Sequence, residues 1–455
     1  MSKLRCFKAY DIRGRIPDEL NDTLAYQIGQ AYAAFVRPKV VAVGRDIRES
    51  SAQLRDSLTR GLTDAGVDVA DIGLCGTEGV YFATFSEQLD GGIMVTASHN
   101  PPDYNGMKFV REQSRPISAD TGLADMQALI EGSRLPGNAL RSGRVSALDT
   151  SGDYLQHLLG YVAADKLKPL RIVVNAGNGG AGLIIDQLEP HLPFEFIKIN
   201  HRPDGSFPHG VPNPMLEENR ASTIEAIRRS KADAGLAWDG DYDRCFFFDE
   251  HGDFIEGYYL VGLLAEVFLR RYRGARIVHD PRLTWNTIDI VQQNGGQPVL
   301  CKSGHAFIKQ RMREVDAVYG GEMSAHHYFR DFAYCDSGMI PWLLVLAAMS
   351  ASGKTLSDLV GERQALYPVS GEINRQIGEQ AGAAMSAMAR VQQNYQARAK
   401  SIDFTDGLSM EFERWRFNLR ASNTEPLVRL NVESRGNATL MHEKTAEILR
   451  LLDAA

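Results

Sequence analysis

Three aspartates stand at every second position in the segment DGDYDR, residues 239–244. Carboxylates crowded together in this way repel one another unless a cation lies among them. A ligand set made only of oxygen atoms suits a hard cation such as Mg²⁺ or Ca²⁺. We therefore predict a metal site at Asp239, Asp241 and Asp243. The alternative interpretation is a solvated acidic turn.

The same spacing approaches that of an EF-hand calcium loop, with Glu250 at the twelfth place. The sixth place of such a loop must be glycine to make its sharp turn, and in this chain it is Arg244. The places that follow hold Cys245 and three phenylalanines, which are typical of a buried strand and not of ligands. We reject the EF-hand interpretation.

A candidate nucleophile lies in the segment VTASHNPPDYNGMK, residues 95–108, which follows an apolar run. Ser98 has His99 beside it and Lys108 ten residues further on. The GxSxG pattern of a hydrolase nucleophile elbow is absent, which disfavours a hydrolytic triad. A serine near a metal site and cationic side chains favours phosphoryl transfer, because those charges would neutralise the transferred group. An ordinary polar turn remains the alternative.

Two further polar segments could bind a substrate. The segment RASNTEP, residues 420–426, combines Arg420, Ser422, Asn423 and Thr424 between two predicted strands, which is a suitable set for binding phosphate. The segment GGEMSAHH, residues 320–327, has paired histidines, but neighbours on an extended chain face opposite ways, and no third zinc ligand follows at the usual spacing. A loop that binds sugar hydroxyls is as plausible.

A third segment, GNGGAG at residues 177–182, matches the glycine pattern of a dinucleotide-binding turn. The strand after it ends in Ile199, Asn200 and His201, without the acidic residue that would bind a ribose. Glycines for a tight strand-to-helix turn explain the pattern. The segments 302–305 and 10–13 add polar side chains that could equally belong to ordinary turns.

The elements that must position these loops repeat along the chain. Segments beginning VVAVGRD (40–46), LRIVVNAG (170–177) and ARIVHDP (275–281) each predict a strand, a helix and a second strand. One more apolar strand follows each unit and ends in the serine, aspartate or GGEMSAHH loop. Alternation of β-branched runs with helices predicts sheets with parallel strands. Because ligands bind beyond the carboxyl ends of such strands, we expect the three loops to converge on one cleft.

After about residue 366 the pattern changes to a long Ala- and Gln-rich helix, several strands and a last helix. The predicted fold class is α/β: three similar α/β domains with mixed sheets and a smaller C-terminal α+β domain around a central cleft. The predicted boundaries are 1–147, 148–251, 252–366 and 367–455.

The composition of the 455 residues limits the possible partners. A net charge of −7 without a basic cluster argues against nucleic acid. The longest apolar runs stop near a dozen residues, whereas a bilayer requires about 20. The start MSKLRCF lacks the apolar region of a secretory signal, and the cysteines are scattered without a CxxC pair. We therefore expect a cytoplasmic protein with no membrane or nucleic-acid partner.

Four segments of the chain, taken together and in order, resemble the phosphoserine, metal, sugar and phosphate loops of the α-D-phosphohexomutase superfamily: TASHNPPDYNGMK, DGDYDR, GEMSAHH and RASNTEP. The resemblance is close to the bacterial phosphomannomutase/phosphoglucomutase branch of that superfamily. The resemblance covers essentially the whole chain. It implies four domains around a cleft and interconversion of mannose 6-phosphate and mannose 1-phosphate, together with the glucose phosphates. The reaction would pass through a hexose 1,6-bisphosphate, which is also the activator, and the enzyme would be a monomer.

The resemblance also implies roles for single residues. Ser98 would carry the phosphoryl group, and with Asp239, Asp241 and Asp243 it would hold one Mg²⁺. Candidates for proton transfer are Lys108, His305 and His99, and Arg244 would contact the sugar or the moving phosphoryl group. The residues expected to bind substrate are Tyr10, Arg13, Arg282, Glu322, Ser324, His326, Arg420, Ser422, Asn423 and Thr424.

Some positions depart from the common pattern of the superfamily. Tyr242 and Ala325 stand where glycine is usual, and Arg282 stands where lysine is frequent. These match a subgroup that supplies GDP-mannose and surface polysaccharides, and Met323 favours mannose and glucose phosphates over glucosamine phosphate. The preference between mannose and glucose stays open. The alternatives are a phosphoglucosamine mutase, a metal-dependent phosphosugar phosphatase and a catalytically silent sugar-phosphate-binding protein.

Overall fold

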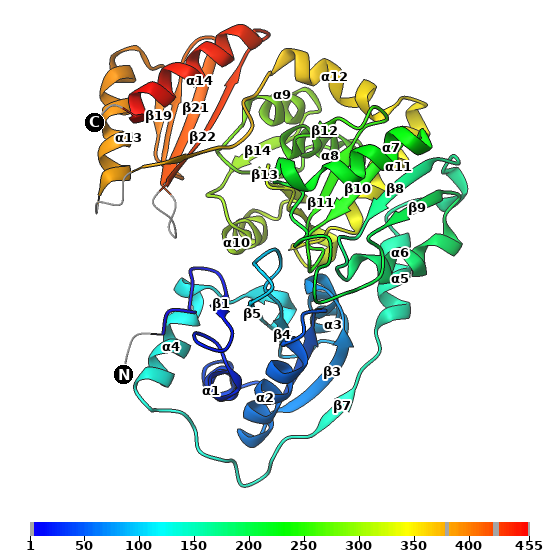
Figure 1. Cartoon of the computed structure of the whole chain (residues 1–455), viewed down its shortest axis with the longest axis vertical. Coiled ribbons are helices and arrows are strands. Elements are labelled where there is room, and N and C mark those ends of the chain that lie inside the picture. The colour runs from blue at the N-terminus through cyan, green and yellow to red at the C-terminus, as the bar shows by residue number, and fades with distance from the viewer. Residues whose placement is uncertain (1–3, 378–381, 422–426, 454–455) are drawn as a thin grey trace. The chain divides into compact units, whose positions relative to one another are not determined.

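The computed structural model describes residues 4–377, 382–421 and 427–453. The predicted phosphate-binding residues Ser422, Asn423 and Thr424 lie outside these ranges. The described residues form two compact bodies (Figure 1). The first body comprises the described residues up to 254 together with 326–353, and the second comprises 255–325 together with the described residues from 354 onward.

The first sheet of the first body has the order β1-β5-β4-β2-β3-β7, with β6 paired to β5. Strands β3, β2 and β4 run parallel, whereas β5 is antiparallel to both β4 and β1. The strands are β1 (Ile12–Arg15), β2 (Val40–Arg45), β3 (Asp68–Leu74), β4 (Gly91–Val95), β5 (Tyr104–Arg111), β6 (Arg115–Pro116) and β7 (Val145–Ala147).

The helices of this region are α1 (Asp22–Val36), α2 (Ser51–Asp64), α3 (Thr77–Ser86) and α4 (Leu123–Glu131). Helix α1 begins where the Asn21 side chain accepts a hydrogen bond from the Leu24 backbone N–H, 3.0 Å away. Its buried face includes Leu24, Ile28 and Tyr32, which share one core with α2 and the sheet. Burial of these apolar faces fixes the sheet whose strand ends carry the serine loop.

A second sheet in the first body repeats this pattern. Strands β10, β8 and β9 are parallel, and β11 is antiparallel to β10. The elements are α5 (Ser151–Leu159), β8 (Arg171–Asn175), α6 (Ala181–Leu188), β9 (Glu195–Ile199), α7 (Ala221–Ser230), β10 (Ala234–Trp238) and β11 (Cys245–Phe248), followed by β12 (Phe254–Ile255). The antiparallel pair β16 (His327–Phe329) and β17 (Cys335–Asp336) and helix α11 (Ile340–Ser352) complete this body.

The second body contains another parallel set, in which β13 lies between β14 and β15. Its elements are α8 (Gly257–Arg271), β13 (Arg276–His279), α9 (Trp285–Gln293), β14 (Gln297–Leu300), α10 (His305–Val315), β15 (Tyr319–Gly321) and α12 (Leu356–Leu366). The strand order around β13 is the order found around β2 and β8, so the repeated pattern in the sequence reflects a repeated topology.

The C-terminal region of the second body is an antiparallel sheet in the order β18-β22-β21-β20-β19 (Figure 1). Its elements are β18 (Ile373–Gln376), α13 (Ala383–Tyr395), β19 (Ser401–Asp403), β20 (Leu408–Glu411), β21 (Trp415–Ala421), β22 (Leu427–Ser434) and α14 (Ala438–Asp453). Apolar residues of α13 and α14 form one core with the strands. The predicted class, three α/β regions and a C-terminal α+β region, is confirmed.

Within the described part of the chain, no single helix has both the length and the apolar content needed to cross a bilayer. Helices α11 and α12 reach those limits only when they are taken together as a bent pair. Most of α11 is buried inside the first body, as expected of a core helix.

Candidate active site

The serine loop connects β4 to β5, at the carboxyl end of β4. The Ser98 hydroxyl is buried and donates a hydrogen bond to Asp239 Oδ2, 2.6 Å away. The backbone of Ser98 has a φ of +46°, in the left-handed region that residues other than glycine rarely occupy. Its N–H donates to Thr96 Oγ1 at 2.9 Å. A strained, buried serine aimed at a carboxylate is typical of a functional position.

The aspartate loop lies between β10 and β11, which excludes the EF-hand because Cys245 begins β11. Asp239, Asp241 and Asp243 are all buried, and each offers a carboxylate oxygen within 4.8 Å of the other two. We call these three residues the acidic cluster. Gly240 brings the aspartate loop against the serine loop, because a Cβ there would lie 2.4 Å from the Ser98 carbonyl oxygen. The oxygen-only donor set fits a hard cation.

Helix α3 holds the aspartate loop from the other side. The Tyr242 hydroxyl accepts a hydrogen bond from the Gly76 N–H at 2.7 Å, and the Thr77 N–H donates to the Asp241 carbonyl at 3.2 Å. Thr77 Oγ1 also donates to Asp241 Oδ2. Tyr242 has a φ of +46°, so its ring packing and hydrogen bond must outweigh the backbone strain. Tyr242 therefore anchors the loop to the N-terminus of α3.

Two cations face the acidic cluster. Lys108 Nζ donates to Asp241 at 2.7 Å and to Asp243 at 2.5 Å, and Arg244 donates through Nε and Nη2 to Asp239 at 2.9 and 2.7 Å. Burial disfavours the charge of Lys108, but both carboxylates outweigh that effect and raise its pKa above the usual value. Burial raises the pKa of Asp239; Arg244 opposes this effect, and the neighbouring carboxylates add to it. A bound cation would relieve that repulsion.

His99 lies beside the nucleophile. Its Nδ1 is 3.1 Å from Ser98 Oγ, and Arg244 Nη2 donates to the same nitrogen. Because a guanidinium can only donate, Nδ1 is an acceptor and the ring hydrogen lies on Nε2. Partial burial and the positive charge of Arg244 lower the pKa of His99 well below its usual value. His99 is therefore a neutral imidazole with an acceptor nitrogen near Ser98.

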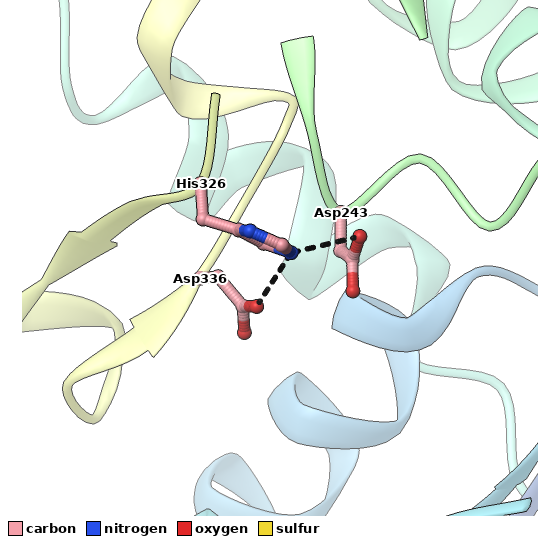
Figure 2. A group of neighbouring side chains, drawn as sticks. All are labelled: Asp243, His326 and Asp336. Atoms are coloured by element: carbon pink, nitrogen blue, oxygen red, sulfur yellow. Dashed lines mark ion pairs between the residues drawn. The ribbon is translucent and has the colours of Figure 1, made fainter. Parts of the chain in front are cut away.

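His326 joins the acidic cluster through Asp243, as Figure 2 shows. Its Nε2 lies 3.6 Å from Asp243 Oδ1 and 3.9 Å from Asp336 Oδ2. One ligand atom from each of these three residues lies within 4.8 Å of the others. The imidazole thus points between two buried carboxylates, one of which, at the end of β17, the sequence interpretation did not include.

Of the two predicted residues at the start of the chain, Arg13 contacts the serine loop. Arg13, in β1, donates to Asp11 Oδ2 at 2.8 Å and to Asn100 Oδ1 at 3.3 Å. Its side chain is largely buried. Tyr10 lies just before β1 and is partly buried. These contacts attach the β1 region to the loop that carries Ser98.

Two of the predicted sugar-loop residues, Glu322 and Ser324, contact Arg282 in the second body. Arg282 Nη2 donates to Glu322 Oε1 at 3.3 Å, to Ser324 Oγ at 3.2 Å and to Asp280 Oδ2 at 2.8 Å. The Gly304 N–H donates to Glu322 Oε1 at 2.9 Å, which brings His305, the first residue of α10, close to this group. Hydrogen-bond donors and acceptors are thus gathered around Arg282.

Arg420 lies in β21 of the same body and is paired with two carboxylates. It donates to Glu372 Oε2 at 3.0 Å and to Asp406 Oδ2 at 3.2 Å. Glu372 also lies 3.7 Å from Arg282 Nη1. We call Arg282, Arg420, Glu322 and Glu372 the arginine cluster. Its central carboxylate, Glu372, was absent from the sequence interpretation.

Other contributors were missed as well. Three of them lie at the end of a strand or helix, where polar residues are common and form no recognisable motif: Thr77, Asp336 and Glu372. Arg48, which contacts the serine loop, was also missed. By contrast, the glycine-rich segment is explained by packing: the Gly180 N–H lies 3.4 Å from the Gly240 carbonyl, so its glycines allow α6 to approach the aspartate loop.

Comparison with known sequences identifies the same four regions. The chain matches "Phosphoglucomutase/phosphomannomutase, alpha/beta/alpha domain I" over residues 4–132, domain II over 152–252, domain III over 256–367 and the C-terminal domain over 372–450. An Escherichia coli phosphomannomutase is 58% identical over 99% of this chain and 100% of its own length. The Xanthomonas campestris pv. campestris protein named phosphohexose mutases is 58% identical, over 99% of both chains.

Solved structures agree with the sequence matches. A phosphoglucomutase/phosphomannomutase family protein of Burkholderia thailandensis has a TM-score of 0.88 and 31% identity, covering 99% of this chain and 98% of that chain. An Aspergillus fumigatus N-acetylphosphoglucosamine mutase in complex with glucose 1,6-bisphosphate has a TM-score of 0.61 over 99% of this chain and 95% of that chain; at 14% identity it shows the fold alone.

The fold and these matches define an enzyme of the intramolecular phosphotransferase class, an isomerase. The chain belongs to the phosphoglucomutase/phosphomannomutase family within the α-D-phosphohexomutase superfamily.

Proposed function

We propose that this protein interconverts mannose 6-phosphate and mannose 1-phosphate, and glucose 6-phosphate and glucose 1-phosphate, through a phosphoryl group carried on Ser98. The observation that carries the proposal is the 2.6 Å hydrogen bond between the buried Ser98 hydroxyl and Asp239 of the acidic cluster. A serine that stores a phosphoryl group needs positive charge beside it where water is excluded. The acidic cluster, with Lys108 and Arg244 against it, would supply that charge by holding a cation.

Asp239, Asp241 and Asp243 would hold one Mg²⁺ together with an oxygen atom of the phosphorylated Ser98. The donor set is oxygen only, and the three carboxylates converge on one another, which supports a small hard cation over a softer one. When bound, Mg²⁺ would neutralise charge on the phosphoryl group.

In the first step, a free hydroxyl of the hexose phosphate attacks the phosphorus atom on Ser98. The bond from phosphorus to Ser98 Oγ breaks as the new bond to the sugar oxygen forms, and a hexose 1,6-bisphosphate results. Lys108 and Arg244, both buried beside the acidic cluster, supply positive charge on the protein side of the transfer. This bisphosphate would act as both intermediate and activator.

In the second step, the bisphosphate turns around and Ser98 Oγ attacks its other phosphate. The bond from that phosphorus to the sugar oxygen breaks, and the hexose monophosphate leaves as the product. The acceptor within reach of the Ser98 proton is Asp239 Oδ2, 2.6 Å away. His99 Nδ1 lies 3.1 Å from Ser98 Oγ but already accepts a hydrogen bond from Arg244. Lys108 is held protonated by two carboxylates, which favours it as a donor over a base. His305 remains a candidate for the proton of the sugar hydroxyl.

The remaining predicted residues would hold the substrate in either orientation. Glu322, Ser324 and His326 would bind sugar hydroxyls, and Arg244 would contact the sugar or the moving phosphoryl group. The phosphate that does not react would bind to Arg420, Ser422, Asn423 and Thr424, with Tyr10, Arg13 and Arg282 in supporting positions. We further propose that the protein is a monomer and that it is located in the cytoplasm. The free cysteines support the proposed location.

Product analysis tests the proposal. Incubation with mannose 6-phosphate, Mg²⁺ and a trace of glucose 1,6-bisphosphate is expected to give mannose 1-phosphate in ³¹P NMR with total phosphate ester conserved. Stoichiometric release of inorganic phosphate would instead identify a phosphatase. No change in either signal would indicate a silent binding protein, and turnover restricted to glucosamine 6-phosphate would identify a phosphoglucosamine mutase.

A further inference from the structure

Arg48 lies between β2 and α2, and its guanidinium contacts the serine loop in the first body. Nη2 donates to the carbonyl oxygens of Ser98 at 2.9 Å and Asn100 at 2.6 Å. Nη1 donates to those of Pro101 at 2.8 Å and Tyr104 at 2.9 Å. One side chain therefore binds four carbonyl groups within a span of seven residues, and the first of them belongs to the nucleophile.

The Arg48 side chain is only 1% exposed. A buried guanidinium is costly unless most of its donors are hydrogen-bonded and its charge is paired, and both Nη atoms of Arg48 are hydrogen-bonded. Asp46 provides the pairing: its carboxylate lies 3.6 Å from Arg48 Nε, and its Oδ1 accepts from the Arg48 backbone N–H at 3.0 Å. The Phe207 ring lies 5.2 Å from the guanidinium carbon. Such a buried arrangement is too specific to be a chance surface contact.

The four hydrogen bonds determine how the loop presents its serine. Fixing the Ser98 carbonyl holds the peptide plane that follows a residue with a φ of +46°, a conformation that the free loop would rarely adopt. The direction of the Cα–Cβ bond, and hence of Oγ toward Asp239, follows from that backbone. A guanidinium offers several donors in a fixed plane, whereas a lysine ammonium offers a compact point charge that cannot span four carbonyls.

We propose that Arg48 is a positioning residue for the phosphoryl transfer, holding the serine loop so that Ser98 Oγ faces the acidic cluster. This inference rests on the proposed function, in which Ser98 carries the phosphoryl group. Arg48 acts through the backbone carbonyls and is not assigned a contact with substrate.

Replacing Arg48 tests the role, because misplacing a reacting group by about 1 Å can lower the rate about 100-fold. In Arg48→Ala we expect kcat to fall by about 100-fold with little change in KM. Guanidinium ion added at millimolar concentration, below denaturing levels, is expected to restore part of kcat. Arg48→Lys fills more of the same space and keeps the charge, so we expect a smaller loss, of about 10-fold, without rescue by guanidinium.

Arg55→Ala is the matched control. Arg55 lies on α2, seven residues further on, and is paired with Asp71 at 2.5 Å. Among the described residues, Arg55 forms no hydrogen bond with any of the four loop carbonyls. The kcat of Arg55→Ala should therefore equal that of the wild type, with or without guanidinium. Melting temperatures of all variants are recorded with the kinetics, so that unfolded protein is not counted as inactive enzyme.

The closing experiment starts from protein whose Ser98 has first been dephosphorylated with excess mannose 6-phosphate and then desalted. It measures by intact mass how fast Ser98 accepts phosphate from glucose 1,6-bisphosphate. We expect rapid labelling of the wild type and Arg55→Ala, and slow labelling of Arg48→Ala that guanidinium accelerates. A wild type that takes no phosphate on Ser98 overturns the proposed function and this inference with it. Normal labelling of Arg48→Ala overturns the positioning role alone. A third outcome also overturns the positioning role. If labelling of Arg48→Ala and Arg48→Lys slows in proportion to a fall in melting temperature, and guanidinium does not restore it, Arg48 has a purely structural role.

Discussion

The acidic cluster of the first body and the arginine cluster of the second body arrange charge in opposite ways. In the acidic cluster, carboxylates face one another and two cations approach from the sides. In the arginine cluster, each arginine is already paired with carboxylates: Arg282 with Glu322 and Asp280, and Arg420 with Glu372 and Asp406.

This difference indicates what each cluster is built to receive. Carboxylates that converge repel one another, and a further cation relieves that repulsion. The acidic cluster therefore suits a metal ion with a phosphoryl group bound to it. Arginines held by carboxylates are fixed in direction and largely neutralised, which suits recognition of a ligand that must bind and also turn around. The first cluster is therefore expected to control kcat, and the second to control substrate affinity.

The largest difference between the two clusters is expected from the variant Asp241→Asn. Removing one carboxylate weakens the cation site, and we expect kcat/KM to fall about 10³-fold. In the wild type, Mg²⁺ at 100 times its Kd should stabilise the fold by about 2.7 kcal/mol, and EDTA should reverse this effect. Differential scanning fluorimetry measures the melting temperature with and without Mg²⁺.

Glu372→Gln is the matched control for that experiment, because it removes a carboxylate from the arginine cluster instead. Its melting temperature should respond to Mg²⁺ as the wild type does. An Asp241→Asn protein that Mg²⁺ stabilised equally well would contradict the assignment of the cation to the acidic cluster.

A second test addresses the arginine cluster. In Arg420→Ala a charged hydrogen-bond donor is lost, and such bonds contribute about 1.5–3 kcal/mol. We expect KM for mannose 1-phosphate to rise about 10- to 100-fold, with a smaller change in kcat and unaltered stabilisation by Mg²⁺. Arg375→Ala, which breaks an exposed pair with Asp453, serves as control and should leave the kinetics unchanged. A fall in kcat at constant KM would contradict the division of roles.

A third test uses pH. Glu78, in α3, accepts hydrogen bonds from Ser337 and Gly338, next to Asp336. Burial raises its pKa to about 8, and the hydrogen bond from Ser337 opposes that rise. Because the folded pKa exceeds the unfolded one, the folded state binds the extra proton between about pH 4.5 and pH 8. Stability is therefore lost as pH rises through that window, by up to about 1.4 kcal/mol per pH unit.

Glu78→Gln carries a neutral side chain at every pH and should remove this contribution. Thermal unfolding of both proteins from pH 5 to pH 8 is the measurement. The stability of the variant relative to the wild type should increase as pH rises. A difference in stability that does not change with pH would show that Glu78 is not protonated in the folded protein.

The smallest effect is expected from Tyr242→Phe. The ring would still pack against Gly76, but the hydrogen bond from the Gly76 N–H would be lost, at a cost of about 1 kcal/mol. We expect a lower melting temperature and an affinity for Mg²⁺ reduced several-fold, measured by titration of activity. Unchanged metal affinity would indicate that Tyr242 stabilises the fold without holding the aspartate loop.

Much of the chemistry could be predicted from the sequence, because Ser98 and the acidic cluster lie in short segments at the ends of apolar strands. Arg48 could not be predicted. Its partners are backbone carbonyls some 50 residues away, and carbonyls leave no pattern in a sequence. Asp336 and Glu372 were missed for a similar reason: each acquires its role only when the fold brings a distant histidine or arginine beside it.

The most direct test of the account is intact-mass measurement of phosphate on Ser98, combined with single-turnover transfer to mannose 1-phosphate. The wild type is expected to carry one phosphoryl group at Ser98 and to lose it to the sugar as bisphosphate, whereas Ser98→Ala should accept none and should turn over at least about 10⁴-fold more slowly. A Ser98→Ala enzyme with near-normal mutase turnover would contradict the account.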